Sequence, residues 1–97
     1  MPLALQILFR RSDAPNEPLV NARIANLSHT GLCLNTGNPI AVGQVLCLVL
    51  EGGPESTPLL GRVVWQVAQP DGRSRAGIKF VNVQPEDAAR LRKWMDG

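Results

Sequence analysis

Alternation of apolar and polar residues marks most of the chain and is typical of β-strands. In residues 3–10 the more apolar side chains occupy every second position, the period of a strand with one buried face. Residues 45–50 are apolar on both faces, as in a strand that is covered on both sides. The pattern predicts strands at about residues 3–10, 20–27, 31–35, 45–51, 58–67 and 75–81.

Turn-forming residues separate these strands and predict hairpins. Residues 12–18 combine Ser, Asp and Asn with two prolines, so we expect the chain to reverse there. Asp71-Gly72 is the strongest hairpin signal, and it joins the last two predicted strands. Regular alternation along the fifth strand places Val63 and Trp65 on the same inward face.

The period becomes helical near the end of the chain. Pro85 suits a first helical position, and the acidic residues after it and basic residues near the end complement the helix dipole. Leu91 and Trp94 recur at helical spacing, so we expect a helix at about residues 85–95, with Trp94 and Trp65 in the core. Several short strands and one helix favour a small closed barrel, because closure removes exposed strand edges.

The composition fits one folded domain and argues against nucleic-acid binding. The chain has 97 residues, 44% of them hydrophobic and 19% charged, and we expect a single domain over residues 1–97. Only 4% of the residues are aromatic, and the net charge of +2 comes from scattered basic residues, so we expect no DNA or RNA partner. A small anionic ligand needs only a few well-placed arginines.

Motifs for catalysis, metal binding and membrane insertion are missing from the sequence. Cys33 and Cys47 lie in apolar runs and are expected to be buried thiols. There is no phosphate-binding glycine loop, metal-spaced cluster or nucleophile elbow, so we expect no enzyme activity, cofactor or metal. No stretch has the length of a membrane span, and residues 1–9 do not look like a signal peptide, so the expected compartment is the cytoplasm.

Residues 26–31 read Asn-Leu-Ser-His-Thr-Gly and fit the pattern (Asp/Asn)-x-Ser-x-x-Gly. Four further features follow this turn in order. They are an alternating strand, a strand that reads Gly-Arg-Val-Val-Trp from Gly61, a strand that reads Gly-Ile-Lys-Phe from Gly77, and the helix from Pro85. Together these features resemble the PilZ domain family over nearly the whole chain. The resemblance implies a mainly β fold, a six-stranded antiparallel β-barrel with one C-terminal α-helix, serving as a bacterial receptor or adaptor for the second messenger cyclic di-GMP.

In the family this turn meets a guanine base, a role that would fall here on Asn26, Ser28 and Gly31. An Asn amide and a Ser hydroxyl can pair with a base edge, and Gly lets the backbone approach a planar ring. The same residue types also stabilise an ordinary turn, because Asn and Ser bond to the local backbone and Gly tolerates positive φ. The sequence is compatible with both roles.

The family's second signature, Arg-x-x-x-Arg roughly twenty residues upstream of the turn, is absent, because no two arginines are four positions apart. Arg10 and Arg11 are adjacent and would point to opposite faces of a strand, so at most one could reach the turn. Arg23, on the strand before the turn, could add a cation to the same surface. Arg73 and Arg75 are interpreted as solvated loop charges. Loss of two guanidinium groups predicts weak binding of the messenger.

Three hypotheses follow for the function. The chain is a receptor that binds cyclic di-GMP weakly through the turn and a nearby arginine. Alternatively, it is an adaptor of the same fold that has lost nucleotide binding and docks on a protein partner, for example in type IV pilus or motility control. In the third hypothesis the chain is a fragment whose arginine segment belongs to a larger protein. An exposed apolar patch on the barrel wall would favour the adaptor.

Overall fold

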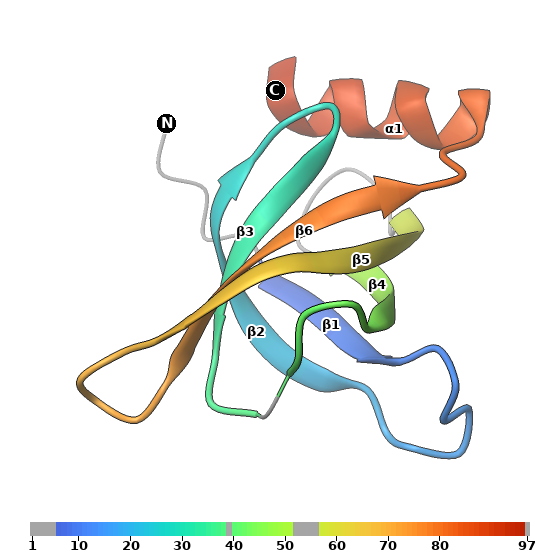
Figure 1. Cartoon of the computed structure of the whole chain (residues 1–97). Helices are drawn as coiled ribbons and strands as arrows, with labels where there is room; N and C mark the ends of the chain where they lie inside the picture. Colours follow the sequence, from blue (N-terminus) through green and yellow to red (C-terminus); the bar gives the residue numbers. More distant parts are fainter. Residues whose placement is uncertain (1–5, 39, 52–56, 97) are drawn as a thin grey trace.

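The structure, a computed structural model, describes residues 6–38, 40–51 and 57–96 and consists of six strands and one helix (Figure 1). Residues 3–5 of the first predicted strand lie outside the described residues. The mainly β fold class is confirmed. The elements are β1 (Gln6–Arg11), β2 (Val20–Leu27), β3 (Gly31–Thr36), β4 (Val45–Glu51), β5 (Thr57–Ala68), β6 (Ser74–Val81) and α1 (Pro85–Asp96).

The strands close into a barrel in the order β1-β2-β3-β6-β5-β4, and every neighbouring pair is antiparallel. β1 completes the ring because it pairs with both β2 and β4. The β5–β6 hairpin forms where Asp71-Gly72 predicts it, with Gly72 at a φ of 85°. In Figure 1, α1 lies across one end of the barrel, beside the turn between β2 and β3.

The barrel interior is filled by apolar side chains that alternate along the strands. In β4, Leu46, Leu48 and Leu50 are buried and their neighbours half-buried, which explains why this strand is apolar on both faces. Each such buried side chain stabilises the fold by about 1.5–3 kcal/mol relative to an exposed one. Leu91 of α1, 1% exposed, extends the core to the helix. The other members are Ile7, Phe9, Ala22, Leu32, Leu34, Ile40, Leu59, Val63, Ala76, Ile78 and Phe80.

The outer wall carries the two cysteines. Cys33 on β3 and Cys47 on β4 are free thiols, and both are half-buried rather than fully buried as expected. They alternate with inward leucines on the same strands, so each thiol lies on the outer side of the wall. The side chain of Trp94, which was expected in the core, lies outside the described residues.

Two β-bulges interrupt the regular alternation. On β2 the pairing with β3 shifts between Ile24 and Asn26, and on β5 the pairing with β6 shifts between Val63 and Trp65. A bulge inserts one extra residue, so the side chains after it change faces. Val63 is 1% exposed but Trp65 is 42% exposed, and the expected core position of Trp65 is wrong for this reason.

Candidate functional site

The turn between β2 and β3 is organised by Ser28. The backbone N–H of Ser28 donates to the Gly31 carbonyl at 2.9 Å, and the Ser28 hydroxyl donates to the same oxygen at 3.1 Å. Thr30 N–H donates to Ser28 Oγ at 3.4 Å, and Phe80 N–H donates to the Thr30 carbonyl at 2.9 Å. Ser28 therefore shapes the turn, and the Phe80 bond fixes the turn to β6.

Asn26 has a different environment from Ser28. The bulge on β2 turns its side chain to the outer wall, where the residue is exposed. Among the described residues, the Asn26 amide has no hydrogen-bond partner. A primary amide has two donors and an acceptor, so Asn26 can bind a ligand without giving up a contact within the protein.

Asn26 belongs to a row of outward residues that crosses four strands. Asn26 pairs with Cys33 on β3, Cys33 with Gly77 on β6, and Gly77 with Trp65 on β5. A Cβ atom at Gly77 would lie 2.1 Å from Nε1 and 2.4 Å from Cε2 of the Trp65 indole. The missing side chain at Gly77 therefore lets the indole cover the backbone of β6 while the tryptophan remains partly exposed.

A hollow of about 330 Å³ lies along this row on the outer wall. Its lining includes Asn26, Ser28 and Gly31 of the hexapeptide, together with Trp65 and Lys79. The structure thus brings three of the sequence-predicted site residues together and adds an aromatic ring and a cation that the sequence did not reveal. Gly77 was the signal in the sequence that could have revealed the outward position of Trp65. An indole that lies against a sheet needs a small residue beside it on the neighbouring strand.

Lys79 lies near the turn because β3 and β6 approach each other closely. Gly31 is the register partner of Lys79, and a Cβ atom at Gly31 would lie 2.0 Å from the Ile78 carbonyl oxygen. Lys79 also pairs with Arg62 of β5, and both side chains are exposed. In the part of the chain that the structure describes, neither forms an ion pair. This end of the hollow is therefore positively charged.

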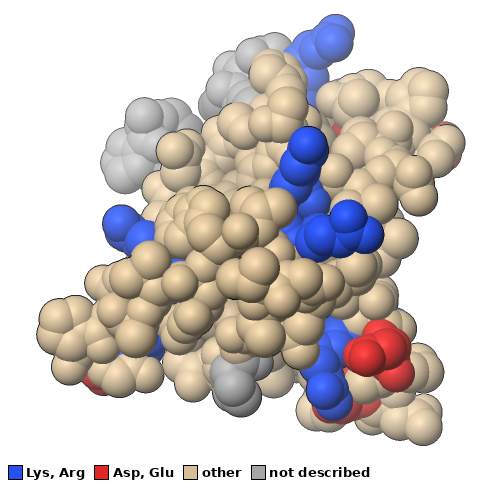
Figure 2. Space-filling model, in the orientation of Figure 1, with Lys and Arg blue, Asp and Glu red and all other residues tan. Residues whose placement is uncertain are grey.

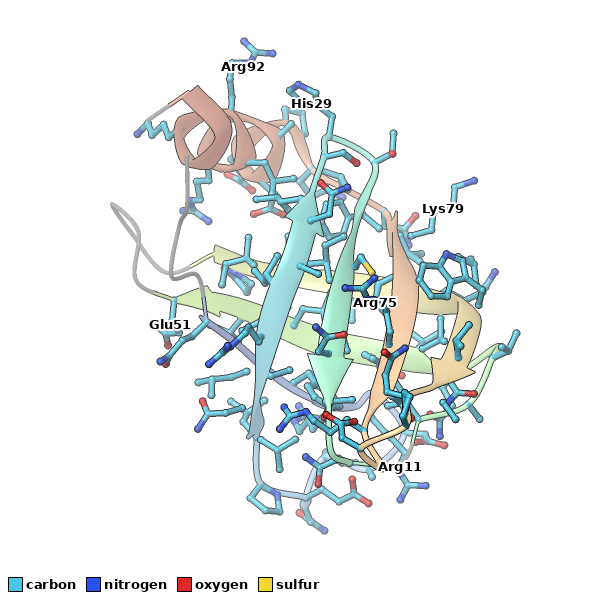
Figure 3. All side chains as sticks on the ribbon, turned by 90° about the vertical axis from the view of Figure 1, so that its left-hand side faces the viewer. Arg11, His29, Glu51, Arg75, Lys79 and Arg92 are labelled. Carbon is cyan, nitrogen blue, oxygen red and sulfur yellow. The ribbon has the colours of Figure 1, made fainter. Side chains whose placement is uncertain are left out.

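Arg10 and Arg11 do not reach the turn. Figure 3 shows Arg11 at the opposite end of the barrel from His29, which lies in the turn. Arg11 donates to Glu17 through Nε, at 3.4 Å, and through Nη2, and these hydrogen bonds with the carboxylate charge raise the pKa of Arg11. Arg10 donates from Nη1 to the Arg11 carbonyl at 3.1 Å, and both line a separate hollow of about 460 Å³.

Arg23 lies on the correct wall but outside the hollow of Asn26. It lines a neighbouring hollow of about 360 Å³ together with Asn35, Arg73 and Arg75. Among the three arginines predicted as ligand contacts, Arg23 shares a face with the hexapeptide. Arg10 and Arg11 line the hollow of about 460 Å³, and Arg10 also lines a further hollow beside β4 and β5.

Other site types find no support in the geometry. Across residues 6–38, 40–51 and 57–96, no group of three or more His, Cys, Asp and Glu side chains could hold a metal ion. Over the same residues, no helix is both long and apolar enough to cross a bilayer.

The chain folds as a closed six-stranded barrel with a C-terminal helix and a hollow on its outer wall, and comparison with known proteins identifies its family. The PilZ domain model matches residues 2–97. The fold is similar to the PilZ domain with c-di-GMP of YcgR from Escherichia coli, with a TM-score of 0.72 and 16% identity, covering 95% of this chain and 79% of that one. No curated protein sequence matches. The chain belongs to the PilZ domain family, as its sequence suggested; PilZ domains are binding and adaptor modules, not enzymes.

Proposed function

We propose that this chain is a regulatory module that binds cyclic di-GMP at the outer-wall hollow beside the β2–β3 turn. The observation that carries the proposal is that two bulges, on β2 and β5, turn Asn26 and Trp65 out to the same row, next to Gly31. The similar PilZ domain of YcgR is described with c-di-GMP, which supports a ligand of the same class.

The lining residues suit the parts of a guanine nucleotide. The Asn26 amide can donate to and accept from a base edge, and the exposed indole of Trp65 offers a face for stacking. Stacking of a base on an aromatic ring contributes about 1–3 kcal/mol. Lys79 supplies positive charge for a phosphate, while the Ser28 hydroxyl is engaged with Thr30 and Gly31 and holds the turn in place.

Isothermal titration of the chain with cyclic di-GMP tests this proposal. We expect saturable heat at roughly tens of micromolar ligand, which corresponds to about 6 kcal/mol of binding free energy. Cyclic di-AMP is the matched control ligand, because it has the same phosphodiester ring but presents a different base edge to Asn26. The absence of heat with cyclic di-GMP, or equal affinity for both dinucleotides, would contradict the proposal.

A second candidate function, an adaptor that docks on a protein partner, is favoured by one observation. An apolar hollow of about 400 Å³ lies on the outer wall of β4 and β5, with Val49, Leu60 and Val81 in its lining. Leu60 is 39% exposed, an unusual position for a leucine on a monomer's surface when apolar neighbours surround it. A folded chain that gives no heat with cyclic di-GMP would favour the adaptor, with the partner setting the process served, such as motility or pilus control.

We place the module in the cytoplasm for a chemical reason. Cys33 and Cys47 are unpaired thiols, and paired cysteines are the usual state in oxidising compartments. Fractionation of the cells that express the chain, followed by detection of the protein in each fraction, tests this placement.

A further inference from the structure

A second group of cations lies on the same outer wall as Asn26. Arg23 on β2 pairs with Asn35 on β3, and Asn35 pairs with Arg75 on β6, so the three form a row across the strands. Asn35 and Arg75 are each two residues from Cys33 and Gly77 of the Asn26 row, a separation of about 7 Å along a strand. Figure 3 shows Arg75 over this face of the barrel.

The guanidinium of Arg75 is oriented by the protein but not neutralised by it. Arg75 Nε donates to Asn35 Oδ1 at 3.3 Å. Within the described residues, neither Nη group of Arg75 has a partner, and Arg23 forms no ion pair. A guanidinium held through Nε directs its two outer N–H groups away from the contact, as a fork that matches two oxygens of a phosphate.

The surroundings of these arginines favour an anion. They line a hollow of about 360 Å³ with Arg73, so three arginines face a single carboxylate, that of Asp71. The Asp71 carboxylate accepts a hydrogen bond from the Arg73 backbone N–H at 3.0 Å and is thereby held to its own turn. Cations gathered in this way repel one another, and an anion placed between them relieves the repulsion.

We propose that Arg23 and Arg75 form an anion-binding subsite for a phosphate group. When cyclic di-GMP is bound, this subsite holds a phosphodiester of the nucleotide whose base lies at Asn26 and Trp65. This part of the proposal rests on the function proposed above. One nucleotide can reach both rows, because they are about 7 Å apart and an arginine side chain is flexible.

Titration of charge-matched variants with cyclic di-GMP is the first test. Arg75→Gln and Arg23→Gln should each weaken binding about tenfold, because each removes a charge-assisted contact with a phosphate. Arg92→Gln removes the same charge from an exposed position on α1 and should change the affinity less than about twofold. If the Arg23→Gln/Arg75→Gln double variant binds like wild type, or if Arg92→Gln weakens binding equally, the subsite is overturned while cyclic di-GMP binding stands.

Titration with inorganic pyrophosphate, followed by ¹H–¹⁵N NMR, separates the subsite from the nucleotide proposal. Saturable shifts at the amides of Arg23, Asn35 and Arg75, absent with chloride at equal ionic strength and lost in folded Arg75→Gln, support the subsite. If pyrophosphate produces them but cyclic di-GMP gives no heat, the nucleotide proposal fails and the site takes a free phosphate compound. If neither ligand binds, both proposals fail. If cyclic di-GMP binds in an arginine-dependent way but pyrophosphate causes no shifts, the subsite recognises the phosphodiester of the nucleotide and not a free phosphate compound.

Discussion

Arginines at two places on the barrel surface are in opposite electrostatic situations. At the β1–β2 end, Arg11 is bonded to Glu17, which raises the pKa of Arg11. On the β2-β3-β6 face, Arg23, Arg75 and Lys79 are exposed and form no ion pair within the described part of the chain. Figure 2 shows a related contrast. In that view the acidic side chains lie mainly at the lower edge, next to basic ones, while other basic side chains have no acidic side chain beside them.

The contrast teaches that the number of arginines is a poor guide to an anion site. A guanidinium that already contacts a carboxylate of its own chain loses that contact when it binds a ligand. A group of cations without acidic partners has no such competitor, so an external anion gains more there. Substitutions on the β2-β3-β6 face and the neighbouring β5 should therefore alter stability or cyclic di-GMP affinity, whereas a substitution at the β1–β2 end should leave the affinity unchanged.

The largest expected effect is on the packing beneath the β2-β3-β6 face. Gly31→Ala places a Cβ atom 2.0 Å from the backbone carbonyl oxygen of Ile78, so β3 and β6 must separate. We expect a loss of about 3 kcal/mol of unfolding free energy, measured by urea denaturation. Gly37→Ala, where nothing lies within 4 Å, is the control and should change stability by less than about 0.5 kcal/mol. Equal stability of the two variants would contradict the close approach.

Removal of the indole comes next. Trp65→Ala should weaken cyclic di-GMP binding about 30-fold, or about 2 kcal/mol, because it takes away the stacking surface of the hollow. Val67→Ala is the matched control, since it truncates another exposed side chain of β5, and it should leave the affinity unchanged. Titration calorimetry measures both. A Trp65→Ala variant that binds normally would place the base elsewhere.

A smaller effect is expected at the amide. Asn26→Ala removes one set of neutral hydrogen bonds to the base and should cost about 1 kcal/mol, a fivefold loss of affinity. Asn21→Ala removes the same group from an exposed position of the same strand and should have no effect. If the two variants bind the dinucleotide equally well, the hexapeptide is only a turn.

The smallest effect is expected at the paired arginine. Arg11→Gln should leave cyclic di-GMP affinity unchanged, because Arg11 is bonded to Glu17 at the far end of the barrel. Arg75→Gln removes the same charge from the β2-β3-β6 face and serves as the comparison. A loss with Arg11→Gln as large as that with Arg75→Gln, measured under the same salt conditions, would remove the distinction between the two regions.

Most of the fold could be predicted because its signals are local. Alternation of period two, the Asp71-Gly72 turn and the helical stripe after Pro85 each depend on residues that are close in sequence. These signals predict a mainly β fold with one helix, while the resemblance to a family depends on the hexapeptide at residues 26–31 and the motifs that follow it. The error at Trp65 arises because a bulge depends on how β5 pairs with β6, and alternation along a single strand contains no record of that pairing.

The site could be predicted only in part for the same reason. Asn26, Ser28 and Gly31 lie in one hexapeptide, so the sequence places them together directly. Arg75 bonds to Asn35 across 40 residues of sequence, and this contact exists only when the register of β3 and β6 is known. The sequence alone therefore does not predict the contact between Arg75 and Asn35.

Closure of the barrel limits how this module can recognise a protein. Within the described residues β1 bonds to both β2 and β4, so the paired stretches of these strands offer no edge at which a peptide could add a further strand by β-augmentation. On these paired stretches the surface available for recognition consists of side chains that point outward, and these alternate with the side chains that stabilise the interior. Ligand preference can consequently evolve on the outside of the wall while the thermodynamic stability of the domain is left largely intact.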